Sequence, residues 1–261
     1  MVEGRVTRGT TGTNRLRRID RWIAQLPALR AATDPLVVDL GYGASATTSL
    51  ELHHRLSRVR DDVEVIGIEI EPSRVALASQ SARPGVSFRL GGFEVPLPRD
   101  RRAAVIRALN VLRQYDETEV VGNWHRMVDR LQPGGVLVEG TCNEIGRVCS
   151  WTDVTAAGPQ TLTISLRLAD LDRPSIVAER LPKILIHRNI PGERIHDLLA
   201  DLDRHWQYNS GLGVYGASQR WIATVRALKA DGWPVRGTVA RWKLGELTVD
   251  WAAVEPRGFA F

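Results

Sequence analysis

Short apolar runs alternate with helical periodicity through the first half of the chain. Residues 36–40 and 64–70 are apolar runs with the length of buried strands, and three further runs follow at 86–90, 103–112 and 136–138. Between these runs, apolar positions recur every three or four residues, which predicts helices over 45–59, 72–78 and 116–131. Strands separated by helices, without hairpin signals, predict a parallel sheet with right-handed crossovers.

Two of the predicted helices carry local start signals. Asp116 can cap the helix that follows it, with Glu119 three residues later as its reciprocal partner. Near the N-terminus, residues 8–14 are small and polar and predict a loop. We expect Thr13 or Asn14 to cap the next helix, with its arginines on the face opposite its apolar residues.

The second half of the chain is patterned less regularly. Residues 161–168 alternate well enough for a strand, and 195–206 and 221–228 have the spacing of amphipathic helices. Residues 238–243 and 247–251 flank a short turn that contains glycine. This arrangement predicts a terminal hairpin.

Composition fits a folded protein with a reducing environment. The 261 residues are 43% hydrophobic and 25% charged, enough apolar material for a sizeable core. The two cysteines, Cys142 and Cys149, form no CxxC pair, and no His/Cys cluster stands near them, so we predict no metal site. Residues 1–12 lack an apolar signal sequence, and the longest apolar runs are strand-sized. We therefore expect a cytoplasmic protein without a membrane span.

The charge is weakly basic, with a net charge of +5 from 35 basic and 30 acidic residues. The one local excess lies near the N-terminus, at Arg5, Arg8, Arg15, Arg17, Arg18 and Arg21. A basic surface can bind nucleic acid, but basic helix faces are more often only solvated. A nucleic-acid partner is therefore not favoured on charge alone.

A glycine-containing turn follows the first predicted strand. The turn begins after Asp39 and contains Gly41 and Gly43, which let the backbone bend sharply and let a ligand approach closely. The helix that follows presents free N–H groups at its N-terminus. Glu69 stands at the end of the second strand, where a carboxylate can accept the hydroxyl hydrogens of a ribose. Ligands bind such sheets at the carboxyl ends of the strands, where the strand order reverses.

Four segments, in order, resemble the motifs of class I S-adenosylmethionine-dependent methyltransferases. Residues 38–43 resemble motif I, D/E-x-G-x-G-x-G, and 66–69 resemble the second motif. Residues 110–115 are similar to the segment after the fourth strand, and 131–137 resemble the L-x-P-G-G-x-L turn into the fifth. There are two departures: Ser45 replaces the third glycine of motif I, and glycines replace the usual acid directly after strand three.

The resemblance implies a fold and a domain organisation. The fold would be α/β, with a single doubly wound Rossmann-like sheet that is mostly parallel and has a C-terminal antiparallel strand. Residues 1–35 would form a basic loop and helix packed on the core. Residues 36–261 would form the methyltransferase-like Rossmann domain, in which 142–261 selects the substrate.

The resemblance also implies S-adenosylmethionine as cofactor and assigns residues to its methionine and ribose parts. Gly41, Tyr42 and Gly43 would lie against the methionine part. Asp39 would either hold the loop or reach the amino group, and Glu69 would bind the ribose hydroxyls. We further hypothesise that residues 10–18 fold over the cofactor, with Arg15 or Arg18 pairing with its carboxylate or with an acidic substrate.

Five further residues are assigned to the adenine and to the methyl group. Ile70 would pack on the adenine, and Phe93 and Glu94 would lie near the adenine amine. Asn110 and Leu112 would line the floor toward which the methyl group points. Because methyl transfer depends mainly on alignment of the reacting atoms, no catalytic residue is named.

Three functions remain in competition. The first is methyl transfer to a small molecule, a lipid-type acceptor or another non-nucleic acceptor, since 110–113 is not an N/D-P-P-Y/F segment and no Pro-Cys pair is present. The second is an NAD-dependent oxidoreductase that uses the same loop and Glu69, against which the 131–137 segment argues. The third is a non-catalytic protein of this fold that binds the cofactor or RNA, which the arginine cluster keeps open.

Overall fold

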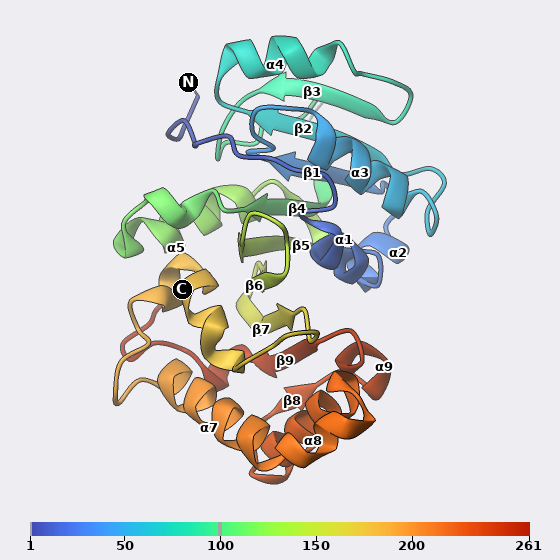
Figure 1. Ribbon diagram of the computed structural model, residues 1–261. Helices are drawn as coiled ribbons and strands as arrows, with labels where there is room; N and C mark the ends of the chain where they lie inside the picture. The colour runs from blue at the N-terminus through green and yellow to red at the C-terminus, as the bar shows by residue number, and fades with distance from the viewer. Residues whose placement is uncertain (1, 99–100) are drawn as a thin grey trace.

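One mixed β-sheet forms the centre of the molecule. The computed structural model describes residues 2–98 and 101–261, and within them a nine-stranded sheet runs in the order β3-β2-β1-β4-β5-β6-β7-β9-β8 (Figure 1). The strands are β1 Leu36–Leu40, β2 Glu64–Glu69, β3 Val86–Leu90, β4 Ala103–Leu109, β5 Leu131–Cys142, β6 Val148–Thr155, β7 Gly158–Leu166, β8 Val235–Arg236 and β9 Glu246–Asp250.

The two halves of the sheet differ in direction. From β3 through β2, β1 and β4 to β5, neighbouring strands are parallel, as the alternating pattern predicts. From β5 to β8, every neighbouring pair is antiparallel. The α/β class and a single sheet with a parallel, Rossmann-like core are confirmed. The prediction of a mostly parallel sheet with one C-terminal antiparallel strand is wrong, because β6 turns back directly after β5 and starts an antiparallel half.

The predicted terminal hairpin is also wrong. Its first arm is the short helix α9, Val239–Trp242, and its second arm is β9, which pairs with β7 and with the two-residue β8. Gly237 and Gly245, on either side of this helix, have φ of 84° and 83°, so the chain turns sharply at both ends. A side chain at Gly245 would also meet the Leu166 carbonyl oxygen at 2.0 Å. The glycines therefore set off a helical turn, not a hairpin.

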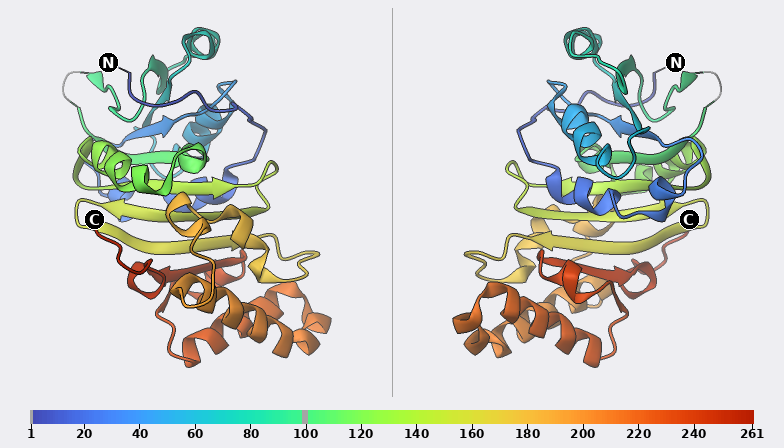
Figure 2. Two further views of the ribbon diagram at one scale, coloured as in Figure 1. Left: turned by 90° about the vertical axis from the view of Figure 1, so that its left-hand side faces the viewer. Right: turned by 90° about the vertical axis from the view of Figure 1, so that its right-hand side faces the viewer.

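Helices cover both faces of the sheet, as a doubly wound fold requires (Figure 2). One face carries α1 Arg17–Ile23, α2 Pro27–Arg30, α3 Thr47–Leu56 and α4 Pro72–Ser79. The other carries α5 Glu117–Val128, α6 Lys183–Ile186, α7 Arg194–Tyr208 and α8 Ala217–Ala230. Short 3₁₀ turns complete the chain, at η2 Leu112–Gln114, η3 Pro174–Arg180, η4 Ser210–Tyr215 and η5 Trp251–Ala253.

Helix starts follow local chemistry where the sequence signals are strong. The capping pair of Asp116 and Glu119 forms at the start of α5, as predicted. Helix α1 begins later than predicted and has Leu16 in the cap position. Asn14 does not cap it, because Asn14 has φ of 61° and its side chain accepts a hydrogen bond from Arg55 at 2.7 Å. Among the residues that the structure describes, no helix has the length and apolar character needed to cross a membrane.

Candidate functional site

The loop between β1 and α3 is held in a conformation that needs glycine. Gly41 and Gly43 have φ of 69° and 89°, where side chains are strained. A Cβ on Gly41 would lie 2.7 Å from a methyl carbon of Val111, and one on Gly43 would lie 2.9 Å from the Gly9 carbonyl oxygen. The Gly41 N–H donates to the Ile68 carbonyl at 2.7 Å, which ties the loop to β2.

A cavity of about 370 Å³ opens beside this loop. Its lining includes Asp39, Gly41, Tyr42 and Gly43 from the first motif and Asn110 from the end of β4. The strand order reverses between β1 and β4, and their carboxyl ends meet here. Five residues of the predicted site are therefore brought together at the position where sheets of this type bind ligands.

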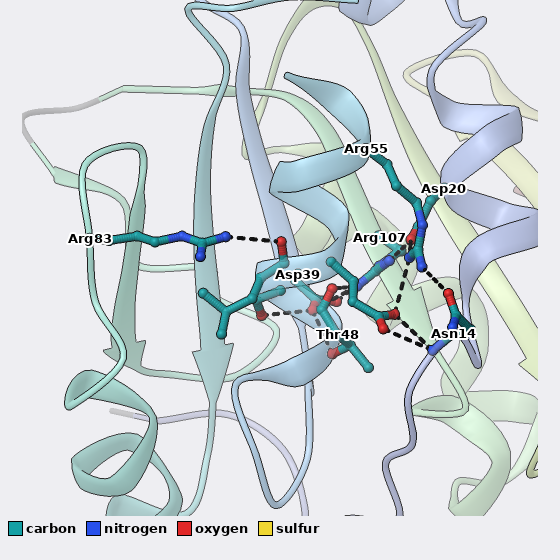
Figure 3. A network of polar contacts seen from close by, with 10 residues as sticks. Asn14, Asp20, Asp39, Thr48, Arg55, Arg83 and Arg107 are labelled. Atoms are coloured by element: carbon teal, nitrogen blue, oxygen red, sulfur yellow. Dashed lines mark hydrogen bonds and ion pairs between the residues drawn. The ribbon is translucent and has the colours of Figure 1, made fainter. Parts of the chain in front are cut away.

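Asp39 faces away from solvent into a buried polar network (Figure 3). Its carboxylate accepts hydrogen bonds from the hydroxyls of Thr48 at 2.9 Å and Ser49 at 2.8 Å. The fully buried Arg107 donates to the same carboxylate at 3.0 Å and also pairs with Asp20 of α1. Asp39 was expected either to hold the loop or to reach the amino group of the cofactor. These contacts correspond to the first role, since the carboxylate is bound to β4 and α3.

Glu69 lies at the end of β2 with only 1% of its surface exposed. Its carboxylate accepts the backbone N–H of Gly43 at 3.1 Å and of Ile70 at 3.2 Å, so it joins the first motif to the second. Arg74 of α4 approaches the same carboxylate at 3.4 Å. A carboxylate bonded mainly through N–H donors keeps lone pairs that can accept further hydrogen bonds.

The expected adenine side of the site is filled by the chain's own N-terminus. Phe93 donates its N–H to the Glu3 carbonyl at 2.9 Å, and Gly4 lies against Ile70 and Phe93. Glu94 accepts the N–H of Glu3 at 2.9 Å. The hollow among Glu69, Ile70 and Phe93 is left with about 20 Å³. Residues 3–7 form this cover, here called the N-terminal strap, and no sequence pattern announces it.

After the strap, the chain continues across the glycine loop. The Ala44 N–H donates to the Gly9 carbonyl at 2.9 Å, and Arg74 donates to the Thr7 carbonyl at 2.9 Å. In Figure 1 the strap is the dark blue trace that runs from the N-terminus past the ends of β2 and β1. The N-terminal residues therefore belong to the site itself.

The two residues expected at the floor differ in position. Asn110 has φ of 63°, a left-handed conformation that a non-glycine residue adopts at a cost of about 1–3 kcal/mol. Its amide side chain bonds Cys142, accepting from the backbone N–H at 3.0 Å and donating to the sulfur at 3.2 Å. Leu112 is fully buried in the core and is not part of the cavity wall, where Leu109 and Arg113 lie instead.

Arg15 and Arg18, which were expected to pair with the cofactor's carboxylate or with an acidic substrate, lie in different places. Arg15 is buried and lines the cavity, and its guanidinium donates to the carbonyls of Thr10, Cys142 and Asn143. Arg18 points elsewhere, to the Leu244 carbonyl at 2.9 Å and to a serine of β7. Of the two arginines, Arg15 is therefore the one that remains a candidate to pair with the cofactor or with an acidic substrate.

Three other arginines line the cavity and were given no role in the site from the sequence. They are Arg8, Arg113 and Arg180. Arg113 lies inside the 110–115 segment that resembles the motif after the fourth strand, so a signal for it was available. Arg180 comes from η3, for which no pattern was identified. Among the described residues, no three His, Cys, Asp or Glu side chains form a cluster that could hold a metal ion.

Comparison with known proteins gives partial likenesses only. No protein-family model matches the sequence, and no curated protein matches it. Among solved structures, the CcbJ methyltransferase from Streptomyces caelestis is 22% identical with a TM-score of 0.37, covering 61% of this chain and 68% of that one. A SAM-dependent methyltransferase from Leishmania major is 14% identical with a TM-score of 0.36, covering 49% of this chain and 50% of that one.

The resemblance extends to a protein that is named for a different activity. The [4+2]-cyclase SpnF is 19% identical with a TM-score of 0.37, covering 54% of this chain and 51% of that one. This chain thus spans about half the length of two of these three structures. Since the likenesses are partial, the fold is defined by the strand order, and the site by its own geometry.

Proposed function

We propose that this chain is an S-adenosylmethionine-dependent methyltransferase that acts on a small-molecule acceptor. One observation carries the proposal: the glycine loop of β1 and the strained Asn110 after β4 line one cavity at the point where strand order reverses, and the buried Glu69 of β2 accepts the Gly43 N–H of that loop and lines the adjoining hollow. Each of the three comes from a segment that resembles a methyltransferase motif.

The donor set around the cavity fits this cofactor. Glu69 can accept ribose hydroxyls, and Ile70 and Phe93 offer apolar surfaces for a purine. Arg15 lines the cavity with a buried guanidinium that donates to the carbonyls of Cys142 and Asn143, and it suits the methionine carboxylate. The cofactor supplies a methyl group bound to a positively charged sulfur.

The protein's own part in the reaction is alignment. The glycine loop and Asn110 both line the cavity, and an acceptor held there has few orientations. Such positioning accelerates a displacement without any acid–base group. Asp39 is not available as a base, because its carboxylate is bound by Arg107 and two hydroxyls.

We expect S-adenosylhomocysteine to bind the purified protein and NAD not to bind. Replacement of Glu69 by Gln should weaken S-adenosylhomocysteine binding by about tenfold to a hundredfold, since charge-assisted hydrogen bonds to the ribose are lost. Titration calorimetry measures both ligands, with Glu255→Gln as the matched control away from the cavity. Binding of NAD alone would establish the oxidoreductase, and binding of neither ligand would contradict both functions.

Deletion of residues 2–7 is expected to tighten S-adenosylhomocysteine binding several-fold. The strap leaves about 20 Å³ beside Ile70 and Phe93, so a purine has to displace it. Its contacts include the Glu3–Phe93 and Thr7–Arg74 hydrogen bonds, each worth about 1 kcal/mol net. Calorimetry on the shortened chain measures the change. Weaker binding would show instead that the strap contributes contacts to the bound cofactor.

A further inference from the structure

The cavity wall carries more positive than negative charge. Arg8, Arg15, Arg113 and Arg180 line it, against the two carboxylates of Asp39 and Glu144. Arg107 already neutralises Asp39. Glu144 lies 3.4 Å from Arg180, with 66% of its side chain exposed to water. The wall is therefore left with an excess of guanidinium groups.

Arg113 and Arg180 both line the cavity, and they come from segments that are in contact. Arg113 donates to the Glu179 carbonyl at 2.9 Å, so η2 and the end of η3 are in direct contact. Burial, followed by the charge of Arg180, lowers the pKa of Arg113. Like charges held together in this way repel each other, and a bound anion would relieve the repulsion.

The backbone under Arg180 is fixed firmly. Its carbonyl accepts hydrogen bonds from the hydroxyls of Thr141 on β5 and Ser150 on β6. Both hydroxyl-bearing residues are buried, so η3 is bonded to the sheet at the residue whose side chain enters the cavity. The antiparallel half of the sheet thereby positions one of the two guanidinium groups.

Several partly buried arginines elsewhere in the chain have carboxylate partners. Arg55, Arg101 and Arg241 each lie within 3.1 Å of an acidic side chain. Among the described residues, no carboxylate lies within 4.0 Å of Arg113, Arg15 or Arg8. Arg180 is paired with a carboxylate, but only with the largely exposed Glu144 at 3.4 Å. The planar guanidinium groups of Arg113 and Arg180 match the oxygens of a carboxylate or a phosphate.

We propose that the methyl acceptor is a small organic acid whose carboxylate or phosphate group binds Arg113 and Arg180. The proposal rests on the function proposed above and adds the substrate class. In the cavity of about 370 Å³, the methionine part of the cofactor would lie beside the glycine loop and the small acceptor beside the arginine pair.

The acid group serves as a handle, and a different atom of the acceptor is methylated. Oxygens that accept hydrogen bonds from two guanidinium groups are poor nucleophiles, since their electron pairs are engaged. In the transfer, a nucleophilic atom elsewhere on the acceptor forms a bond to the methyl carbon. The carbon–sulfur bond breaks with its electron pair remaining on sulfur, and the acceptor's proton passes to water.

The test titrates benzoate, phenyl phosphate and neutral benzyl alcohol into protein saturated with S-adenosylhomocysteine. At least one anion should bind, and benzyl alcohol should bind at least tenfold more weakly. Arg113→Gln and Arg180→Gln should each weaken the anion about tenfold, the loss expected for one charge-assisted hydrogen bond. Arg173→Gln removes the same charge just before η3, outside the cavity wall, and should leave anion binding unchanged.

The outcomes separate the two proposals. The inference would be overturned if anion binding survives both substitutions, or if the anions bind no better than benzyl alcohol. A loss of S-adenosylhomocysteine affinity in Arg113→Gln and Arg180→Gln, with the anion unaffected, would assign these arginines to the cofactor and also overturn it. If S-adenosylhomocysteine fails to bind the unaltered chain, the proposed function fails, and the same anion titrations without it still test the arginine pair. Preference between benzoate and phenyl phosphate identifies the acid group.

Discussion

Replacement of Arg107 by Met is expected to lower the free energy of unfolding by about 3–5 kcal/mol, as for other buried ion pairs that lose one partner. Arg107 has no exposed surface, and its guanidinium lies between Asp39, at 2.7 Å, and Asp20. It also donates to the Thr48 carbonyl at 3.1 Å. Removal of the guanidinium would leave two carboxylates buried and close together without a shared cation.

Urea unfolding of the variant measures this effect, with Arg101→Met as the control. Arg101 also bridges two carboxylates, Asp34 and Glu64, but at the surface, where such pairs contribute about 0–1 kcal/mol. Addition of Asp39→Asn to Arg107→Met should recover part of the lost stability, because Asp20 keeps its ion pair with Arg55 and Asp39 is the carboxylate that loses its cation. Equal losses in Arg107→Met and Arg101→Met would show that the buried network contributes little.

The same network explains why the first motif could be read from sequence and its support could not. Asp39, Gly41 and Gly43 lie within five residues, and their strand-turn-helix setting is a local pattern. Arg107 of β4, which pairs with both Asp39 and Asp20 of α1, lies far away in the chain, and an arginine within an apolar strand run gives no local signal. Long-range polar contacts of this kind appear only once the topology is known.

The fold shows a similar division. The parallel half was predictable because its strands are continuous apolar runs, such as Leu36–Leu40, which is buried throughout. In the antiparallel half, β7 and β9 were predicted as strands at 161–168 and 247–251, but β6 was missed because polar side chains such as Ser150 and Thr152 fill buried positions there. Hydrogen bonds across and beneath the strands satisfy several of these groups. A pattern based on apolar residues does not detect such strands.

The candidate site follows local motifs at its centre and long-range contacts at its edges. The glycine loop, Glu69 and Asn110 were expected from local motifs, and they gather at one place. The N-terminal strap and Arg180 were not expected, because neither follows a periodic pattern. Both reach the site through contacts with residues far away in the chain, such as Glu3 with Phe93 and Thr141 with Arg180.

A second large effect is expected at Glu139, which lies on β5 between β4 and β6 and has no exposed surface. Among the described residues, neither oxygen of its carboxyl group has a hydrogen-bond partner. Burial raises the pKa of Glu139 to about 8, and the nearby Trp124 indole offsets only part of this increase. An unpaired charge at this position would be costly, so the folded protein holds the carboxyl group in its neutral form at neutral pH.

The sign of the pH dependence follows from this raised pKa. In the unfolded chain the Glu139 carboxyl ionises near pH 4.5, whereas in the folded protein it stays protonated up to about pH 8. Its contribution to stability is therefore complete below pH 4.5 and is lost as the pH rises to about 8. Each pKa unit corresponds to about 1.4 kcal/mol, so the loss amounts to roughly 3–5 kcal/mol over this interval.

Glu139→Gln should remove this pH dependence, because an amide is neutral at every pH and has nearly the same shape. We expect the variant to unfold with a free energy close to that of the unaltered protein at pH 4.5 and about 3–5 kcal/mol above it at pH 8. Urea unfolding at both pH values measures the difference, and Glu255→Gln should follow the unaltered protein at each. A constant difference between Glu139→Gln and the unaltered protein across this interval would mean that Glu139 ionises in the folded state as it does in the unfolded chain. The titration of Glu139 should also affect ligand binding. Glu139 lies on the strand that ends at Cys142, whose N–H is bonded by Asn110 at the floor of the cavity. We therefore expect S-adenosylhomocysteine binding to depend less on pH in the variant than in the unaltered protein.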